Sequence, residues 1–185
     1  IPNEPPVDFD PYNATYNEIK LYITPGLKYI REPKEKIFLG SKWPTFYVIW
    51  KKGIPGLIKS EINFDYLELG LEQNINFGVM GNTSYIIKTG DFFNTKDLRI
   101  IDYKFMRQGD PLFFQNPQKA FQALDSTNQV FDRYFQGNLL HEFNGALINK
   151  IPFLKKLQLQ EIAGGGFLFT KESAQVDAAA REKTF

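Results

Sequence analysis

The side chains of this sequence that are suited to proton transfer within regular segments are one histidine and three carboxylates. His141 is the only histidine, and it shares the phase of its apolar neighbours Leu139 and Phe143. A catalytic histidine works with a nucleophile or with a carboxylate that orients it, and the sequence nominates neither. His141 is therefore predicted to have a structural role.

Glu68, Glu72 and Glu142 occupy polar positions of long alternating segments. Two such carboxylates would in principle suffice for a general acid and a general base. Alternation also places polar side chains together on one face of a strand. We expect these carboxylates to line a polar interior rather than to react.

The other motifs that would support chemistry are absent or incomplete. Without cysteine the chain has no disulfide, thiolate metal site or Cys nucleophile. Gly164-Gly165-Gly166 lacks the Lys-Ser/Thr that follows in a phosphate-binding loop. A net charge of +1 and a pI near 8.0 give no electrostatic case for nucleic acid. No catalytic, cofactor-binding or metal-binding residue is predicted, and no cofactor is expected.

The composition predicts a single β-rich domain. The 185 residues suffice for one sizeable domain, and 43% hydrophobic residues exclude disorder. Aromatic residues make up 16%, which is high for a soluble domain. No apolar run reaches the roughly 18 residues of a spanning helix. A closed β-barrel, with strands of about 9–11 residues, is the remaining way for this chain to cross a membrane.

Alternation of apolar and polar residues predicts about eight strands, separated by turns rich in Gly and Pro, and no helix of note before the end. The expected strands are 16–23, 27–31, 45–52, 61–79, 83–93, 99–107, 131–147 and 157–170. The segment 108–128 is long and irregular, while other connections are short, which is typical of outer-membrane barrels.

The two longest strands carry the clearest two-faced pattern. From Leu67 to Val79 and from Phe131 to Leu147, odd positions are mostly apolar and even positions mostly polar. Before Tyr66 the phase is reversed, which predicts a bulge or a bend near that residue. A kink is expected at the three glycines of 164–166.

Four aromatic residues, Trp43, Phe46, Tyr47 and Trp50, lie close together in the sequence. They fit either a ligand platform or the aromatic girdle of a membrane barrel, and we favour the girdle. His141 would lie near the same membrane interface.

Three segments of the sequence are similar to a known family: residues 27–46 (LKYIREPKEKIFLGSKWPTF), 88–93 (KTGDFF) and 141–156 (HEFNGALINKIPFLKK). They resemble the C-terminal barrel region of large Bacteroidetes outer-membrane proteins with an N-terminal carboxypeptidase-regulatory-like domain and a domain of unknown function. The similarity covers about residues 10–170. It implies an outer-membrane β-barrel to which this chain supplies some strands, and it implies no peptidase activity.

The expected fold is all-β, with antiparallel up-and-down strands of a transmembrane barrel that is larger than this chain. Residues 1–15 are an irregular lead-in, 16–170 the barrel region, and 171–185 a helical or disordered tail that departs from the family pattern. The predicted function is a non-catalytic structural, transport or assembly role in the bacterial outer membrane. Its partners would be outer-membrane lipid and other envelope proteins. The alternative is a soluble β-barrel or sandwich that binds an apolar ligand.

Overall fold

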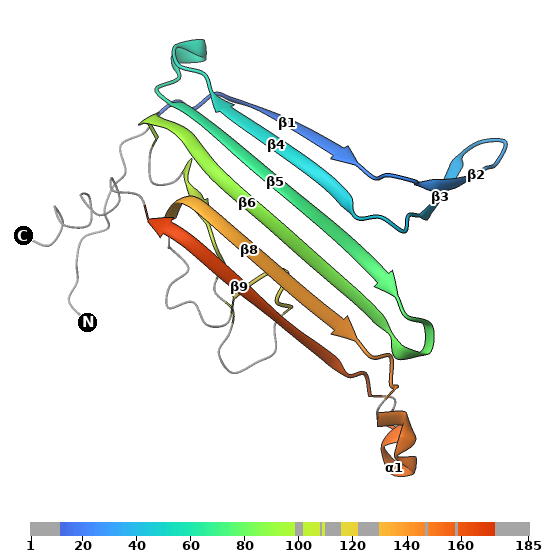
Figure 1. Ribbon diagram of the computed structural model, residues 1–185. Coiled ribbons are helices and arrows are strands. Elements are labelled where there is room, and N and C mark those ends of the chain that lie inside the picture. Colours follow the sequence, from blue (N-terminus) through green and yellow to red (C-terminus); the bar gives the residue numbers. More distant parts are fainter. Residues whose placement is uncertain are drawn as a thin grey trace, which may run out of the picture.

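The chain forms one curved antiparallel sheet whose long strands lie side by side in sequence order (Figure 1). The computed structural model describes residues 12–98, 102–107, 109, 116–121, 130–146, 148–157 and 159–172. The long strands are β1 (Tyr16–Ile23), β4 (Thr45–Gly53), β5 (Asn63–Asn76), β6 (Asn82–Asp97), β8 (Val130–Glu142) and β9 (Ile162–Glu172). The predicted all-β, antiparallel class is confirmed.

Shorter elements lie at the ends of the sheet. Strands β2 (Lys28–Arg31) and β3 (Lys36–Gly40) form a separate hairpin between β1 and β4, and β7 (Lys104–Phe105) pairs with the start of β8. The helical pieces are 3-10 turns at Leu57–Lys59, Gly78–Met80 and Ile148–Lys150 and one α-helical turn, α1 (Pro152–Lys155). No helix in the described ranges is long and apolar enough to cross a membrane.

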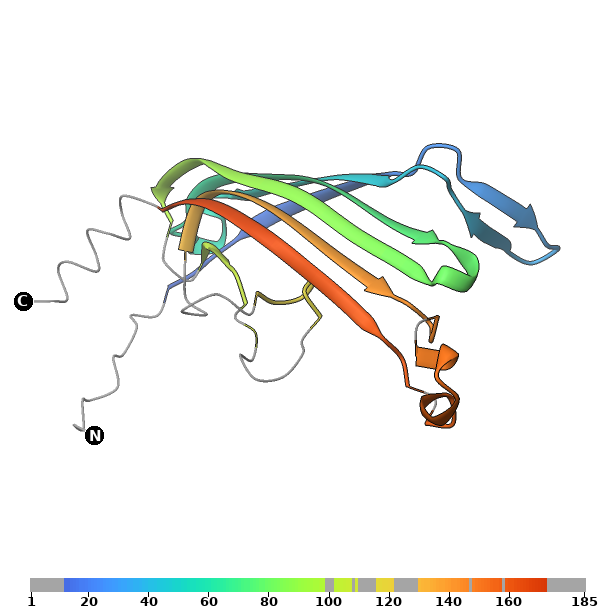
Figure 2. The same ribbon diagram turned by 60° about the horizontal axis from the view of Figure 1, so that its bottom comes forward.

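The sheet has a covered face and an open face. Figure 2 shows it arching over residues 102–107 and 116–121, which we call the covering segment. Glu68, Lys88 and Gln136 lie on this concave face. Lys88 pairs with Gln136 and with Gly70, and Glu68 is two residues from Gly70, so all three side chains point to the same side of the sheet. The intervening side chains point to the convex face, and Figure 2 shows no described segment lying over that face.

The hydrophobic core is small and lies between the concave face and the covering segment. Its buried members are Ile62, Phe64, Tyr66, Met106 and Tyr134. Phe121 and Leu168 pack against it from its margin. The core therefore occupies only the end of the sheet where β5 begins.

The irregularity predicted near Tyr66 is confirmed, but β5 does not change face where the polarity pattern reverses. Ile62, Phe64, Tyr66 and Glu68 are all buried on the concave face, so the alternation of β5 is unbroken. The register shifts between Asn63 and Tyr66 arise because β6 contributes the extra residues. The polarity pattern of the sequence reverses because the concave face of β5 is apolar up to Tyr66, where it forms the core, and polar from Glu68 onward.

Several predicted boundaries also differ. No strand is predicted between residues 31 and 45, but Lys36–Gly40 forms β3. The strand 131–147 ends at Glu142, because Asn144 and Gly145 adopt positive φ angles of 51° and 79°. The strand 157–170 runs instead from Ile162 to Glu172, and it passes through the three glycines without a register shift.

The prediction for 99–107 is only partly correct, since its described residues 102–107 contain the two-residue strand β7. The expected tail from Lys171 begins two residues too early, because β9 continues to Glu172. Residues 1–11 and 173–185 lie outside the described residues, as does most of 108–128. Long connections occur at both ends of the sheet, since 24–44 and 143–161 lie at the end opposite the connection that leads into the covering segment.

Candidate functional site

The concave face is organised around the buried carboxylate of Glu68, which is 4% exposed. Its Oε2 atom accepts hydrogen bonds from the hydroxyls of Tyr66 at 2.5 Å and Tyr134 at 2.6 Å. The same atom lies 3.2 Å from Lys104 Nζ, and Oε1 accepts a longer bond of 3.4 Å from the Tyr47 hydroxyl. We call these five residues the Glu68 clamp. Buried carboxylates need this kind of charge pairing and hydrogen bonding to offset their lost hydration.

Two glycines make the clamp possible. Tyr47 pairs with Gly70 across β4 and β5, and its ring lies over that glycine. Gly90 stands between Glu68 on one neighbouring strand and Tyr134 on the other. Because Gly90 has no side chain, the Tyr134 ring crosses β6 and reaches the carboxylate two strands away. Aromatic rings lying over strand glycines are a known means of stabilising curved sheets.

Substituting Gly90 with alanine is expected to destabilise the protein by about 1–3 kcal/mol, the usual range for overpacking a filled site. A Cβ atom there would lie 2.5 Å from Tyr134 Cε1 and 2.7 Å from the Tyr66 hydroxyl. Urea unfolding followed by intrinsic fluorescence measures the loss. Gly165→Ala in β9 is the matched control, because a Cβ at Gly165 meets nothing within 4 Å. Equal losses in the two variants would show that Tyr134 does not depend on the space above Gly90.

The covering segment is attached to the sheet by further polar contacts. The Asn138 side-chain amide donates to the Pro117 carbonyl at 2.6 Å, and the Gln118 amide donates to Ser84 Oγ at 2.8 Å. Together with the ion pair of Lys104, these bonds connect the covering segment to β5, β6 and β8. The concave face is thus partly filled by a connection of the same chain.

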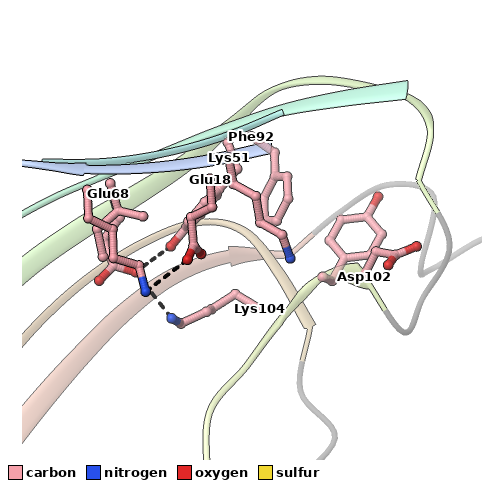
Figure 3. A pocket seen from close by; sticks show the side chains of 10 residues that line it. Glu18, Lys51, Glu68, Phe92, Asp102 and Lys104 are labelled. Atoms are coloured by element: carbon pink, nitrogen blue, oxygen red, sulfur yellow. Dashed lines mark hydrogen bonds and ion pairs between the residues drawn. The ribbon is translucent and has the colours of Figure 1, made fainter. Parts of the chain in front are cut away.

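A polar cavity of about 210 Å³ remains beside the Glu68 clamp. Figure 3 shows Glu18, Lys51 and Glu68 lining it from the strands and Asp102 and Lys104 lining it from the covering segment. Its basic side chains are partly engaged: Lys20 pairs with Glu18 at 2.8 Å, and the Lys51 ammonium lies 4.0 Å from the Tyr16 ring centroid. The cavity is charged but nearly balanced, which suits water and small polar solutes.

The Glu68 clamp is poorly suited to proton transfer. Oε2 of Glu68 accepts bonds from two hydroxyls and lies beside the Lys104 ammonium, and Oε1 accepts a longer bond from Tyr47. The carboxylate is thus engaged mainly with partners inside the protein. Within the described ranges no group of His, Asp and Glu side chains is arranged to hold a metal ion. The prediction that the chain has no catalytic, cofactor or metal residue stays a prediction.

The predicted carboxylates do not meet. Glu72 lies four residues beyond Glu68 on the same strand, roughly 13 Å away at the usual rise, and it is exposed. Glu142 ends β8 and is also exposed. Only Glu68 takes part in the clamp, so the structure assembles no acid/base pair from these three residues.

His141 lies on the convex face, in the phase that the sequence predicted. Its Nδ1 lies 2.7 Å from Thr83 Oγ1, and its Nε2 lies 3.1 Å from the Met80 carbonyl oxygen. The ring also makes an edge contact with Phe143 at 4.2 Å between centroids. Both ring nitrogens are engaged in local structure, which supports the structural interpretation.

The aromatic cluster is divided between the two faces. Phe46 and Trp50 are exposed on the convex face and Trp43 lies in the β3–β4 connection. Tyr47, however, is buried on the concave face and belongs to the Glu68 clamp. Tyr47 was thus wrongly grouped with its neighbours, because its odd position puts it in phase with Ile49 and Lys51.

Four members of the clamp, namely Tyr47, Tyr66, Lys104 and Tyr134, are not predicted from the sequence to lie beside Glu68. A usable signal was present for Tyr134, which shares its phase with Gln136 and Asn138 on the polar side of β8. A tyrosine in the polar phase of a strand has a hydroxyl that needs a buried partner. No sequence pattern indicates the partner of Lys104, which lies on another element.

In the part of the chain that the structure describes, these features define an all-β protein with an antiparallel sheet. One face carries polar groups and a small core and is partly covered by its own chain, and the other face is apolar and uncovered. The chain belongs to a family of unknown function, DUF5686, whose C-terminal domain model matches residues 1–175. No curated protein and no solved structure matched the chain. The expectation of a family of unknown function is confirmed, while the accompanying N-terminal domains and the bacterial group stay predictions.

Proposed function

We propose that this chain forms part of the wall of a β-barrel in the bacterial outer membrane, with a structural, transport or assembly role and no catalysis. The observation that carries the proposal is the exposed apolar convex face. A soluble monomer rarely exposes a contiguous apolar patch of more than a few hundred Å², whereas a membrane barrel turns such a face to lipid.

The convex face is apolar across nearly the whole sheet. One register row joins Leu21, Val48, Leu69, Thr89, Phe135 and Phe169 through β1, β4, β5, β6, β8 and β9. Leu69 is 44% exposed and Phe135 is 42% exposed, although both lie in the middle of long strands. The exposed apolar residues of this face are Ile19, Leu21, Ile23, Phe46, Trp50, Leu69, Phe135, Leu139, Phe167 and Phe169.

Polar residues limit this apolar band along β8. At one end Arg133 pairs with Asp91 at 2.6 Å, and Lys171 lies next to Arg133 in the register. At the other end His141 contacts Thr83. Arg133 and His141 are eight residues apart, roughly 26 Å along a strand and roughly 20 Å across the membrane at a usual barrel tilt, close to the apolar band of known barrels.

The concave face fits the interior of such a barrel. It carries the Glu68 clamp, Lys88 and the charged cavity, and its covering segment would lie in the lumen. In the described residues the outer edges of β1 and β9 are unpaired. Because a sheet edge in lipid would leave backbone groups unsatisfied, the proposal requires further strands at both edges.

The alternative, a soluble module that binds an apolar ligand, predicts the opposite orientation. It expects the apolar rows of β5 and β8 to line an interior. The covering segment instead packs against the opposite side of these strands, which carries the Glu68 clamp and the small apolar core. Leu69 and Leu139 lie on the uncovered side. This arrangement favours the membrane proposal over the soluble one.

Trp50 provides a direct test, because the chain has only two tryptophans. In a variant of the intact protein that keeps Trp50 as its single tryptophan, with Trp43 changed to phenylalanine, Trp50 emission in vesicles is expected to be quenched strongly by lipids brominated in mid-chain. Its position on the convex face of β4 gives this result only if that face contacts acyl chains. A protein that stays in the aqueous phase without detergent, with Trp50 quenched by acrylamide instead, would refute the membrane proposal.

A further inference from the structure

The β2–β3 hairpin projects beyond the end of the sheet and is not packed against it (Figures 1 and 2). Every residue of β2 and β3 is exposed. Apolar side chains occupy both of its faces, since Tyr29 pairs with Phe38 and Ile30 pairs with Ile37. An isolated two-stranded hairpin is marginally stable in water, so a hairpin with two apolar faces needs a surface to lie against.

Positive charge is concentrated in the same segment. Residues 27–43, which we call the basic hairpin, contain five basic and two acidic side chains, a net charge of +3 in a chain of net charge +1. The basic residues are Lys28, Arg31, Lys34, Lys36 and Lys42. The Lys36 ammonium lies 5.3 Å from the Tyr29 ring centroid, so cationic and aromatic groups present one mixed surface.

The base of the basic hairpin is held in place at the end of the apolar band. Ile23 and Phe46, which are register partners, are the last convex residues of β1 and β4 before the hairpin. The Trp43 backbone N–H donates to Ser41 Oγ at 3.0 Å, and the Gln73 side chain donates to the Lys42 carbonyl at 2.8 Å. Trp43 itself is 63% exposed. In membrane barrels and amphipathic membrane segments, exposed tryptophans and basic residues are common at the ends of the apolar band, where the lipid headgroups lie.

We propose that the basic hairpin is an interfacial anchor that lies on the anionic phosphate headgroups of the bilayer around the barrel. This inference rests on the proposed membrane location. The apolar side chains of the hairpin enter the headgroup and acyl boundary, while its five cations contact phosphates. A net charge of +3, continuous with the apolar convex face, matches an anionic lipid surface better than it matches a second copy of the same basic segment.

Trp43 reports on this anchor once Trp50 is replaced by phenylalanine. A variant of the intact protein that keeps Trp43 as its single tryptophan, with Trp50 changed to phenylalanine, is reconstituted into phosphatidylcholine vesicles with and without phosphatidylglycerol. Quenching of Trp43 by lipids labelled in the headgroup region is expected to rise when the anionic lipid is present and to fall with added salt. Acrylamide quenching from the aqueous phase is expected to change in the opposite direction.

The charge dependence is tested in the same background. With Lys28, Arg31, Lys34 and Lys36 changed to glutamine, the ratio of docked to free hairpins is expected to fall roughly fivefold per lost cation, which corresponds to about 1 kcal/mol each. The matched control changes four exposed lysines of other segments to glutamine: Lys59, Lys96, Lys119 and Lys156. This control is expected to leave Trp43 quenching unchanged.

The outcomes separate the two proposals. If Trp50 is quenched in mid-chain but Trp43 stays accessible to acrylamide in both lipids, the anchor is refuted and the membrane wall stands. Trp43 protection that depends on protein concentration and not on lipid charge would also refute the anchor, because it would indicate a second copy or another protein as the partner. If Trp50 itself is not quenched in mid-chain, the membrane proposal fails first.

Discussion

Replacing Glu68 by leucine is expected to lower the free energy of unfolding by about 2–4 kcal/mol. The substitution removes the acceptor of two buried tyrosine hydroxyls, from Tyr66 and Tyr134, and each buried group left without a partner costs about 1–3 kcal/mol. The two hydroxyls lie 3.0 Å apart and retain one bond between them, which limits the loss. Lys104 is partly exposed, so water replaces much of what it loses. Urea unfolding of the refolded, intact protein measures the difference.

Glu18→Leu is the matched control for this change. Glu18 is a carboxylate on the same face with a lysine partner at 2.8 Å, but both side chains of that pair are substantially exposed. Exposed pairs contribute about 0–1 kcal/mol. If the two leucine variants lose the same stability, the clamp is no more than a surface ion pair. A second substitution, Lys104→Met, is expected to recover part of the loss from Glu68→Leu, because it removes the unpaired ammonium.

Strand identity could be predicted from local pattern because each strand has two chemically different faces. In β5 and β8, the alternating polarity of the side chains identifies a strand and shows which residues share a face, since a one-residue slip would move every side chain to the other face. The same reasoning placed His141 on the apolar side. Segments as short as β3 carry too few alternating residues, and the charged residue Lys36 concealed its start.

The ends of the strands could not be read from polarity. The pattern of Phe131 to Leu147 continues past Glu142, but the backbone turns at Asn144 and Gly145 with positive φ angles. A glycine or asparagine signals that such a turn is allowed without saying whether it occurs. Lys171 was assigned to a tail for a similar reason, because helical propensity nearby outweighed its pairing with Arg133.

The Glu68 clamp depends on contacts between elements, which explains why only its carboxylate was singled out. Tyr66 and Glu68 are close in sequence, but Lys104 and Tyr134 reach them from 36 and 66 residues away along the chain. The apolar residues from Ile62 to Tyr66 lie on the same face as Glu68. They are apolar because the core covers that end of the strand. Alternation reports which side a residue is on, and it carries no information about what packs there.

The convex face gives the second large expected effect. Leu69→Arg is expected to destabilise the folded protein in bilayers by about 2–4 kcal/mol, the range for arginine at mid-membrane on a lipid-facing strand. Leu69 is suited to this test because it lies in the middle of the apolar row. Its exposed side chain contacts either lipid or water, depending on what surrounds the convex face. Folding yield and urea unfolding in vesicles measure the effect.

Val79→Arg is the control for Leu69→Arg, since Val79 is 89% exposed in the turn beyond β5 and lies outside the apolar band. It is expected to change stability by less than about 0.5 kcal/mol, as for most surface substitutions. The two environments make opposite predictions for Leu69. In a bilayer the arginine must bring its charge into hydrocarbon or distort the strand, whereas in water it would reduce an exposed apolar patch and improve solubility. The sign of the change in stability and solubility therefore depends on whether lipid or water contacts the convex face. A more soluble, equally stable Leu69→Arg protein would contradict the membrane wall.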